Sequence, residues 1–110
     1  MISDKEKAAY LAGLFDGEGS IRIEPTGQFI QLRIANKNLE VIKWVKNNFG
    51  GTIEIDAFKR KEGYKKNIHY SWQMGNAAGV KKFLKMVQPY LIIRYQKCTE
   101  ALDHFEDIGK

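Results

Sequence analysis

Two carboxylates stand close together in the segment LAGLFDGEGS, residues 11–20, where an apolar stretch gives way to glycine. A capping-box pattern of Ser3 and Glu6 predicts a helix that runs to about Asp16. A polar helix end is the ordinary explanation of Asp16 and Glu18, but acids are disfavoured at the negative end of a helix dipole. Carboxylates are also the ligands that Mg²⁺ prefers. The segment is therefore a candidate metal site, with Glu18 as its ligand.

Small residues recur on one side of the same helix. Ala9, Gly13 and Gly17 lie four residues apart and so stand one above another, while apolar side chains cover much of the rest. A helix that is apolar nearly all round must be buried nearly all round, and one sheet covers only one side of it. A second copy of the chain, related by a two-fold axis, would cover the other side. The homodimer would bring two Glu18 carboxylates together, which favours a cation between them.

The rest of the chain alternates between strand and helix patterns. Strand-like alternation covers residues 20–24, 29–36, 52–58 and 68–74, and helical spacing covers residues 38–49, 76–88 and 94–108. The order α-ββ-α-ββ-α-α predicts an α+β fold with one antiparallel sheet that helices cover on one face only. A length of 110 residues suits one domain, spanning residues 1–110.

Composition narrows the choice of partners and compartment. The net charge of +5 favours a polyanionic partner. No apolar run approaches the roughly 18 residues of a membrane span, and the first residues do not resemble a signal peptide. The single cysteine, Cys98, excludes an internal disulfide and is expected in the core. We therefore expect an intracellular protein, cytoplasmic or organellar, without a membrane partner.

One face of the expected sheet is polar, and a basic loop joins the last two strands. The alternation places ten side chains on that face: Ser20, Arg22, Glu24, Gln31, Arg33, Glu54, Asp56, His69, Ser71 and Gln73. The loop segment FKRKEGYKK contributes Lys59, Arg60, Lys61, Lys65 and Lys66. Solvation explains both features, but arginine and glutamine also read base edges in a DNA groove, and loop lysines bind phosphates. Both explanations remain open at this point.

The segment YLAGLFDGEGS, residues 10–20, resembles the LAGLIDADG motif of homing endonucleases and matches six of its nine positions. It differs at Phe15, Gly17 and Glu18, by residue types that the motif commonly carries. The segments NKNLEVIKWVKNNFGG, YSWQM and PYLIIRYQ resemble later parts of the family, so the likeness covers nearly the whole chain. The single motif implies the homodimeric branch. The resemblance implies an αββαββα fold with a saddle-shaped antiparallel sheet on double-stranded DNA.

The resemblance also implies roles for individual residues. Glu18 corresponds to the metal-binding acid, the carbonyl of Gly17 to a metal ligand for the partner's half of the site, and Asn36 to the residue that orients attacking water. Arg94 stands where the family usually has lysine, and a guanidinium stabilises charge but does not relay a proton. Glu40 stands where some relatives carry a basic residue, so that charge would have to come from elsewhere.

Together these features predict a Mg²⁺-dependent, site-specific DNA endonuclease, encoded in an intron and active as a homodimer. By the resemblance it would act on a long pseudo-palindromic site and leave short 3′ overhangs. Two alternatives share the fold: an intron RNA maturase, for which RNA would also be a partner, and a DNA-binding module that has lost catalysis. Glu18, Asn36 and Arg94 together argue against the inactive module, but they do not exclude a maturase.

Overall fold

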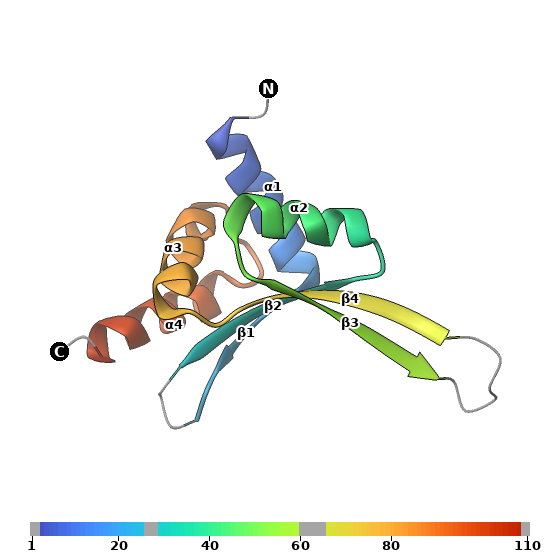
Figure 1. Ribbon diagram of the computed structural model, residues 1–110. Helices are drawn as coiled ribbons and strands as arrows, with labels where there is room; N and C mark the ends of the chain where they lie inside the picture. The colour runs from blue at the N-terminus through green and yellow to red at the C-terminus, as the bar shows by residue number, and fades with distance from the viewer. Residues whose placement is uncertain (1–2, 26–28, 60–65, 109–110) are drawn as a thin grey trace.

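Helices and strands follow one another in the expected order (Figure 1). The computed structural model describes residues 3–25, 29–59 and 66–108. The helices are α1 (Asp4–Glu18), α2 (Leu39–Phe49), α3 (Ala77–Val87) and α4 (Tyr95–Ile108), with a 3₁₀ turn, η1 (Gln88–Tyr90), before α4. The strands are β1 (Gly19–Ile23), β2 (Ile30–Asn36), β3 (Thr52–Lys59) and β4 (Lys66–Met74).

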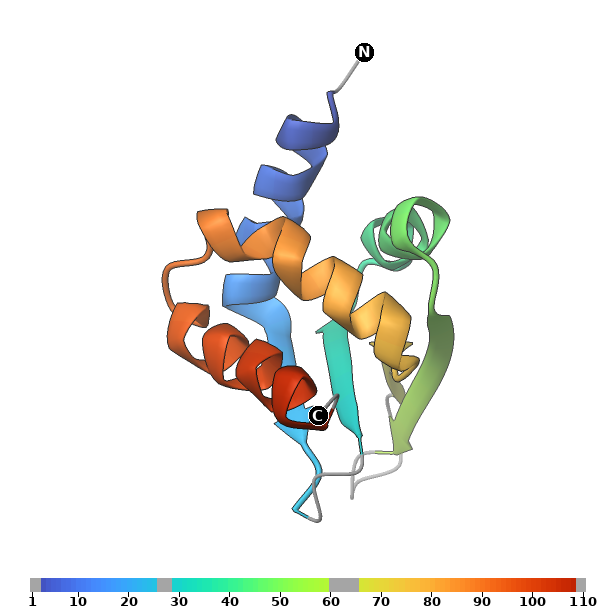
Figure 2. The ribbon, with the colours of Figure 1, turned by 90° about the vertical axis from the view of Figure 1, so that its left-hand side faces the viewer.

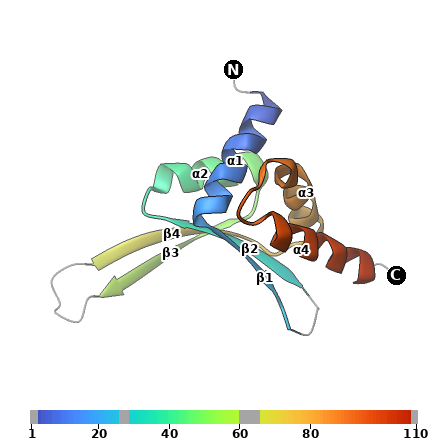
Figure 3. The same cartoon turned by 180° about the vertical axis from the view of Figure 1, so that it is seen from behind.

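The four strands form one antiparallel sheet in the order β1-β2-β4-β3. Its two hairpins bend away from the centre toward opposite sides, so the sheet arches (Figure 1). All the helices lie on the convex face, and no helix covers the concave face in either of two opposite views (Figures 1 and 3). The α+β fold with a saddle-shaped sheet and one covered face is therefore confirmed.

The core lies between the sheet and the helices, where β2 and β4 cross the middle of the arch. Trp72 of β4 is fully buried, stacks on Phe83 of α3 with ring centroids 5.1 Å apart, and donates its indole N–H to the Gly50 carbonyl at 2.6 Å. Cys98 is buried in this core, as predicted. Ile55 belongs to the apolar set by alternation but is 67 % exposed, because β3 extends beyond the helices (Figure 1).

Helix α1 begins as predicted and ends two residues later than predicted. The Ser3 hydroxyl accepts from the Glu6 N–H at 3.1 Å, and the Glu6 carboxylate accepts from the Ser3 N–H at 3.0 Å. The helix continues through Glu18 and passes directly into β1. Gly19 makes this junction possible, because a Cβ there would overlap the ring and carbonyl of Phe15. Glu18 is thereby held at the end of α1, against the sheet.

One side of α1 is buried and the other is exposed. Five residues at helical spacing form the buried side: Ala8, Leu11, Ala12, Phe15 and Asp16. The small residues Ala9, Gly13 and Gly17 are exposed, and Tyr10 is 55 % exposed. In Figure 3 α1 passes in front of α2 with no helix drawn across it, and in Figure 2 its N-terminal part extends beyond the other helices. Within one chain only one side of α1 is covered, as expected, because α2, α3, η1 and the sheet all lie on that side. Coverage of the other side by a second copy stays a prediction.

Candidate functional site

Polar side chains line the concave face of the sheet, and several are ordered by one another. Arg22 and Arg33 are exposed there. The Gln31 amide donates to Gln73 Oε1 at 3.1 Å, and the Gln73 amide donates to Glu54 Oε2 at 3.1 Å. This row crosses β2, β4 and β3, so a side chain from each of three strands is fixed relative to the next. A surface of ordered amides and exposed guanidinium groups can present hydrogen-bond donors and acceptors to base edges.

The other predicted DNA-contacting residues differ in their exposure to solvent. Ser20 is exposed and Glu24 and His69 are half-buried, whereas Ser71 is fully buried. Ser71 differs from its expected exposure because its short side chain lies beneath its neighbours, where its hydroxyl accepts from the Gln73 amide at 3.4 Å. Arg60, Lys61 and Lys65 lie outside the described residues. The prediction that Lys59 and Lys66 lie in the loop is wrong, because the strand pairing continues to them. Lys59 ends β3 and pairs with Lys66, which begins β4.

Two of the three predicted catalytic residues meet in one depression of about 390 Å³, which Glu18, Ala35, Asn36, Lys37 and His69 line. Glu18 reaches it from the end of α1, Asn36 and Lys37 from the end of β2, and His69 from β4. Glu18 is exposed, so its carboxylate is accessible from solvent. The Asn36 side-chain oxygen accepts from the Asn38 N–H at 2.8 Å, which fixes the turn after β2. Lys37 was not among the predicted site residues.

Arg94 does not line this depression. It precedes α4 and is half-buried against the end of α1, where its Nε donates to the Phe15 carbonyl at 3.0 Å. The carboxylate of Asp16 accepts from the Ile92 N–H at 2.7 Å and from the Arg94 N–H at 3.0 Å. The two acids of the motif, Asp16 and Glu18, therefore lie in different surroundings. Asp16 holds the segment before α4 against α1, and Glu18 faces the depression.

The environment of Asp16 keeps its carboxylate ionised. Burial works to raise the pKa of Asp16, but the backbone N–H groups of Ile92, Arg94 and Ile93 donate to it and the Arg94 charge lies close. The net effect is a pKa below the usual value for aspartate. Sequence reasoning missed this structural role. The spacing indicates the burial of Asp16, though not its partners, because Asp16 follows Ala8 and Ala12 on the buried side of α1.

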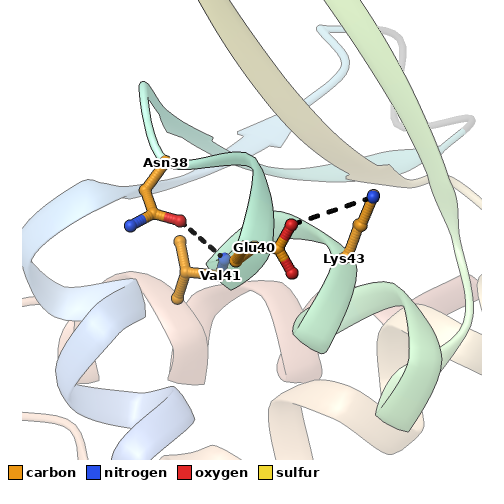
Figure 4. Close-up of polar contacts among 4 residues, drawn as sticks. All are labelled: Asn38, Glu40, Val41 and Lys43. Carbon is orange, nitrogen blue, oxygen red and sulfur yellow. Dashed lines mark hydrogen bonds and ion pairs between the residues drawn. The ribbon is translucent and has the colours of Figure 1, made fainter.

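Glu40 also lies outside the depression, on the solvent side of α2 (Figure 4). Its side chain is 84 % exposed and pairs with Lys43 at 3.9 Å. Asn38 caps the same helix by accepting from the Val41 N–H at 3.2 Å (Figure 4). The charge at this position is therefore balanced within α2 and is not directed at Glu18.

The oxygen donors around Glu18 are of the kind that a hard divalent cation prefers, but they are few. Within the described ranges, no three His, Cys, Asp or Glu side chains come close enough together to hold a metal ion. The Glu18 carboxylate and the last carbonyls of α1, which have no partners within the helix, are the oxygen ligands that Mg²⁺ prefers. A second copy of the chain would double these donors. The donors present are therefore of the right kind for Mg²⁺, and one chain supplies few of them.

The chain is similar to a known protein family in sequence and to solved structures in fold. The family described as "LAGLIDADG-like domain" matches residues 5–102. The homing endonuclease I-CvuI in complex with its target, in the presence of calcium, is 20% identical, with a TM-score of 0.67 over 91% of this chain and 66% of that one. The archaeal intron-encoded homing endonuclease I-Vdi141I complexed with DNA is 20% identical, with a TM-score of 0.63 over 88% of this chain and 65% of that one.

A third structure, I-SmaMI bound to an uncleaved DNA target with calcium ions, is 18% identical, with a TM-score of 0.60 over 93% of this chain and 38% of that one. This chain therefore spans just under two thirds of the first two proteins and less of the third. The likeness shows a shared fold.

A search of curated proteins found no match. No helix in the described part of the chain combines the length and apolarity that crossing a membrane requires.

Proposed function

The chain belongs to the LAGLIDADG-like domain family, and from this premise we propose that it is a site-specific endonuclease of double-stranded DNA. The observation that carries the proposal is the depression in which Glu18 and Asn36 meet, beside the uncovered concave face. That face bears the arginines and glutamines that suit a duplex groove. The structures of I-CvuI and I-Vdi141I, which share the fold, contain target or DNA.

The proposed reaction is hydrolysis of one phosphodiester on each strand, which leaves 5′-phosphates and short 3′ overhangs. A bound divalent ion, Mg²⁺ by our proposal, would activate water and stabilise the departing 3′-oxygen. Glu18 and the carbonyl of Gly17 would hold that ion. Asn36 orients the attacking water through its amide nitrogen, since its oxygen already accepts from the Asn38 N–H. The concave face aligns the duplex so that the phosphate lies over the depression.

The proposal includes a homodimer that forms along the exposed side of α1. A Cβ added at Gly13 or Gly17 would meet no atom within 4 Å, so the packing of the described chain does not require glycine there. Glycine in a helix interior costs about 1 kcal/mol relative to alanine, and close approach of a second helix accounts for that cost. Two copies related by a two-fold axis would bring their Glu18 residues together and complete the metal site.

Cleavage of a randomised duplex library in Mg²⁺ tests the proposed function. We expect the wild type to cut a small set of sites and Glu18→Gln to abolish cutting while it binds those sites within a few-fold of the wild type. Glu100→Gln, which removes an exposed acid paired with Lys97 on α4, is the matched control and should cut normally. Cleavage by Glu18→Gln near the wild-type rate would reject the assignment.

One observation favours the maturase as a second function. Helix α3 contains no acidic residue, and its exposed lysines Lys81, Lys82 and Lys85 lie on the convex side of the molecule, away from the depression. Such a surface attracts a polyanion without occupying the concave face. An intron RNA that binds while DNA stays bound would support this function. An RNA that displaces the DNA would place both on the concave face and argue against it.

A further inference from the structure

Lys37 brings a permanent positive charge to the depression that contains Glu18 and Asn36. It is exposed, directly follows Asn36, and lines the depression together with Glu18 and His69. It lies in the bend directly after β2, whose last pairs are Ala35 with Ser71 and Asn36 with Tyr70. Lys37 belongs neither to the Lys43–Glu40 ion pair nor to the Lys97–Glu100 ion pair. Its ammonium group is thus available to an anion in the depression.

Neither Arg94 nor Glu40 supplies a cation to the depression, because neither residue lines it. The guanidinium of Arg94 donates through Nε to the Phe15 carbonyl, and its backbone N–H is bound by Asp16. Glu40 carries the opposite charge and pairs with Lys43 on the solvent side of α2. Among the described residues that line the depression, Lys37 is therefore the one lysine or arginine.

Local structure holds the backbone of Lys37 in place while its side chain stays adaptable. The preceding strand pairs Asn36 with Tyr70, and the turn is closed by the bond from the Asn38 N–H to Asn36. Asn38 in turn caps α2. Lys37 thus lies between Asn36 and Asn38, whose positions are fixed by these hydrogen bonds and by strand pairing. A lysine stem on such a rigid base can deliver a compact charge with three donors to one phosphate oxygen.

We propose that Lys37 contacts the scissile phosphate and stabilises the negative charge that develops on it during hydrolysis. The inference rests on the proposed endonuclease function. In that reaction a bond forms between the water oxygen and phosphorus, and the bond from phosphorus to the 3′-oxygen breaks. The 3′-oxygen leaves as a hydroxyl after gaining a proton, and the attacking water loses one to solvent. Lys37 keeps its own proton and acts through its charge and hydrogen bonds.

Binding without metal tests this contact separately from cleavage. Duplexes are first selected by binding in EDTA, and a neutral methylphosphonate then replaces each central phosphate in turn. We expect wild-type affinity to fall by about tenfold or more at one phosphate on each strand, as for loss of a charged hydrogen bond. Lys37→Ala should bind the unmodified duplex more weakly and show no further loss at that phosphate. Lys43→Ala, an exposed lysine on α2, should behave as the wild type.

The cleavage rate provides the second readout. In a single turnover with Mg²⁺, Lys37→Ala should cut at least tenfold more slowly than the wild type even at saturating protein, and Lys37→Arg should recover part of the rate. Equal methylphosphonate losses in the wild type and Lys37→Ala would overturn the proposal, even if Glu18-dependent cleavage is present. A Lys37-specific loss without cleavage would support the contact and reject the nuclease function. Failure to select any duplex would reject both.

Discussion

Individual side chains on the concave face differ in how firmly their neighbours hold them. Gln73 is bonded on one side to Gln31 and on the other to Glu54, whereas Arg22 is exposed on the edge strand β1. Truncation of Gln73 therefore also removes a hydrogen-bond partner from Gln31 and from Glu54. Truncation of the exposed Arg22 removes its own guanidinium group only. Substitutions at these two positions should therefore change DNA recognition in different ways.

We predict that Arg22→Ala relaxes base preference at a single base-pair step, at a cost of about 1–3 kcal/mol on the preferred sequence. Gln73→Ala should relax preference over neighbouring steps as well, because Gln31 and Glu54 lose their common partner. Binding to a randomised site library at two salt concentrations measures both effects. Lys59→Ala is the comparison: it should weaken all sequences alike and lower the salt slope by about one unit. A change in salt slope alone for Arg22→Ala would contradict the assignment.

At the scale of elements, one carboxylate connects the first helix to the last. Asp16 of α1 accepts hydrogen bonds from two N–H groups just before α4, and these bonds lower its pKa against the effect of burial. The ionised form of the Asp16 carboxylate is therefore favoured more strongly in the folded state than in the unfolded chain. This contribution to stability is complete above the ordinary aspartate pKa and is lost as the pH falls through the lowered value.

We predict that Asp16→Asn lowers the free energy of unfolding by about 1.5–3 kcal/mol at neutral pH, the range for hydrogen bonds to charged groups. The difference from the wild type should shrink as the pH falls below the ordinary aspartate value, because the wild-type carboxylate then becomes protonated too. Urea unfolding at a series of pH values measures this. Asp103→Asn, an exposed acid on α4, should show no such dependence. A deficit that stays constant down to the lowest pH would argue against the charged interaction.

The elements themselves were predictable from the sequence because their signals are local. The Ser3–Glu6 capping box and the alternation along each strand identified the order of elements and the two faces of the sheet. The family resemblance singled out Glu18 in the motif and Asn36 at the end of the second strand, and the fold brings both to one depression. The contacts of Asp16 and Arg94 were not predictable, since they join residues 76 and 78 positions apart. Local spacing contains no information about which segment packs across the end of α1.

At the scale of the whole molecule, two features lie along the exposed side of α1. Its glycines are not required by the packing of the described chain, and Glu18 at its end is an exposed carboxylate, which by our proposal binds a metal ion. A second copy would resolve both, because one two-fold axis beside α1 brings the helices and the acids together. Dimerisation and catalysis should then be lost together when the helix contact is blocked.

We predict that Gly13→Leu yields folded monomers without cleavage activity. A leucine at this position meets no atom of the described chain near its Cβ, so the single chain can fold around it, whereas a large side chain cannot enter a close helix contact. Sedimentation velocity measures the mass, and circular dichroism checks that the helices persist. Ala78→Leu adds the same side chain to an exposed position on α3 and should stay dimeric and active. An unchanged Gly13→Leu dimer would show that the chains meet through another face, and that the two Glu18 carboxylates are brought together, if at all, by different contacts.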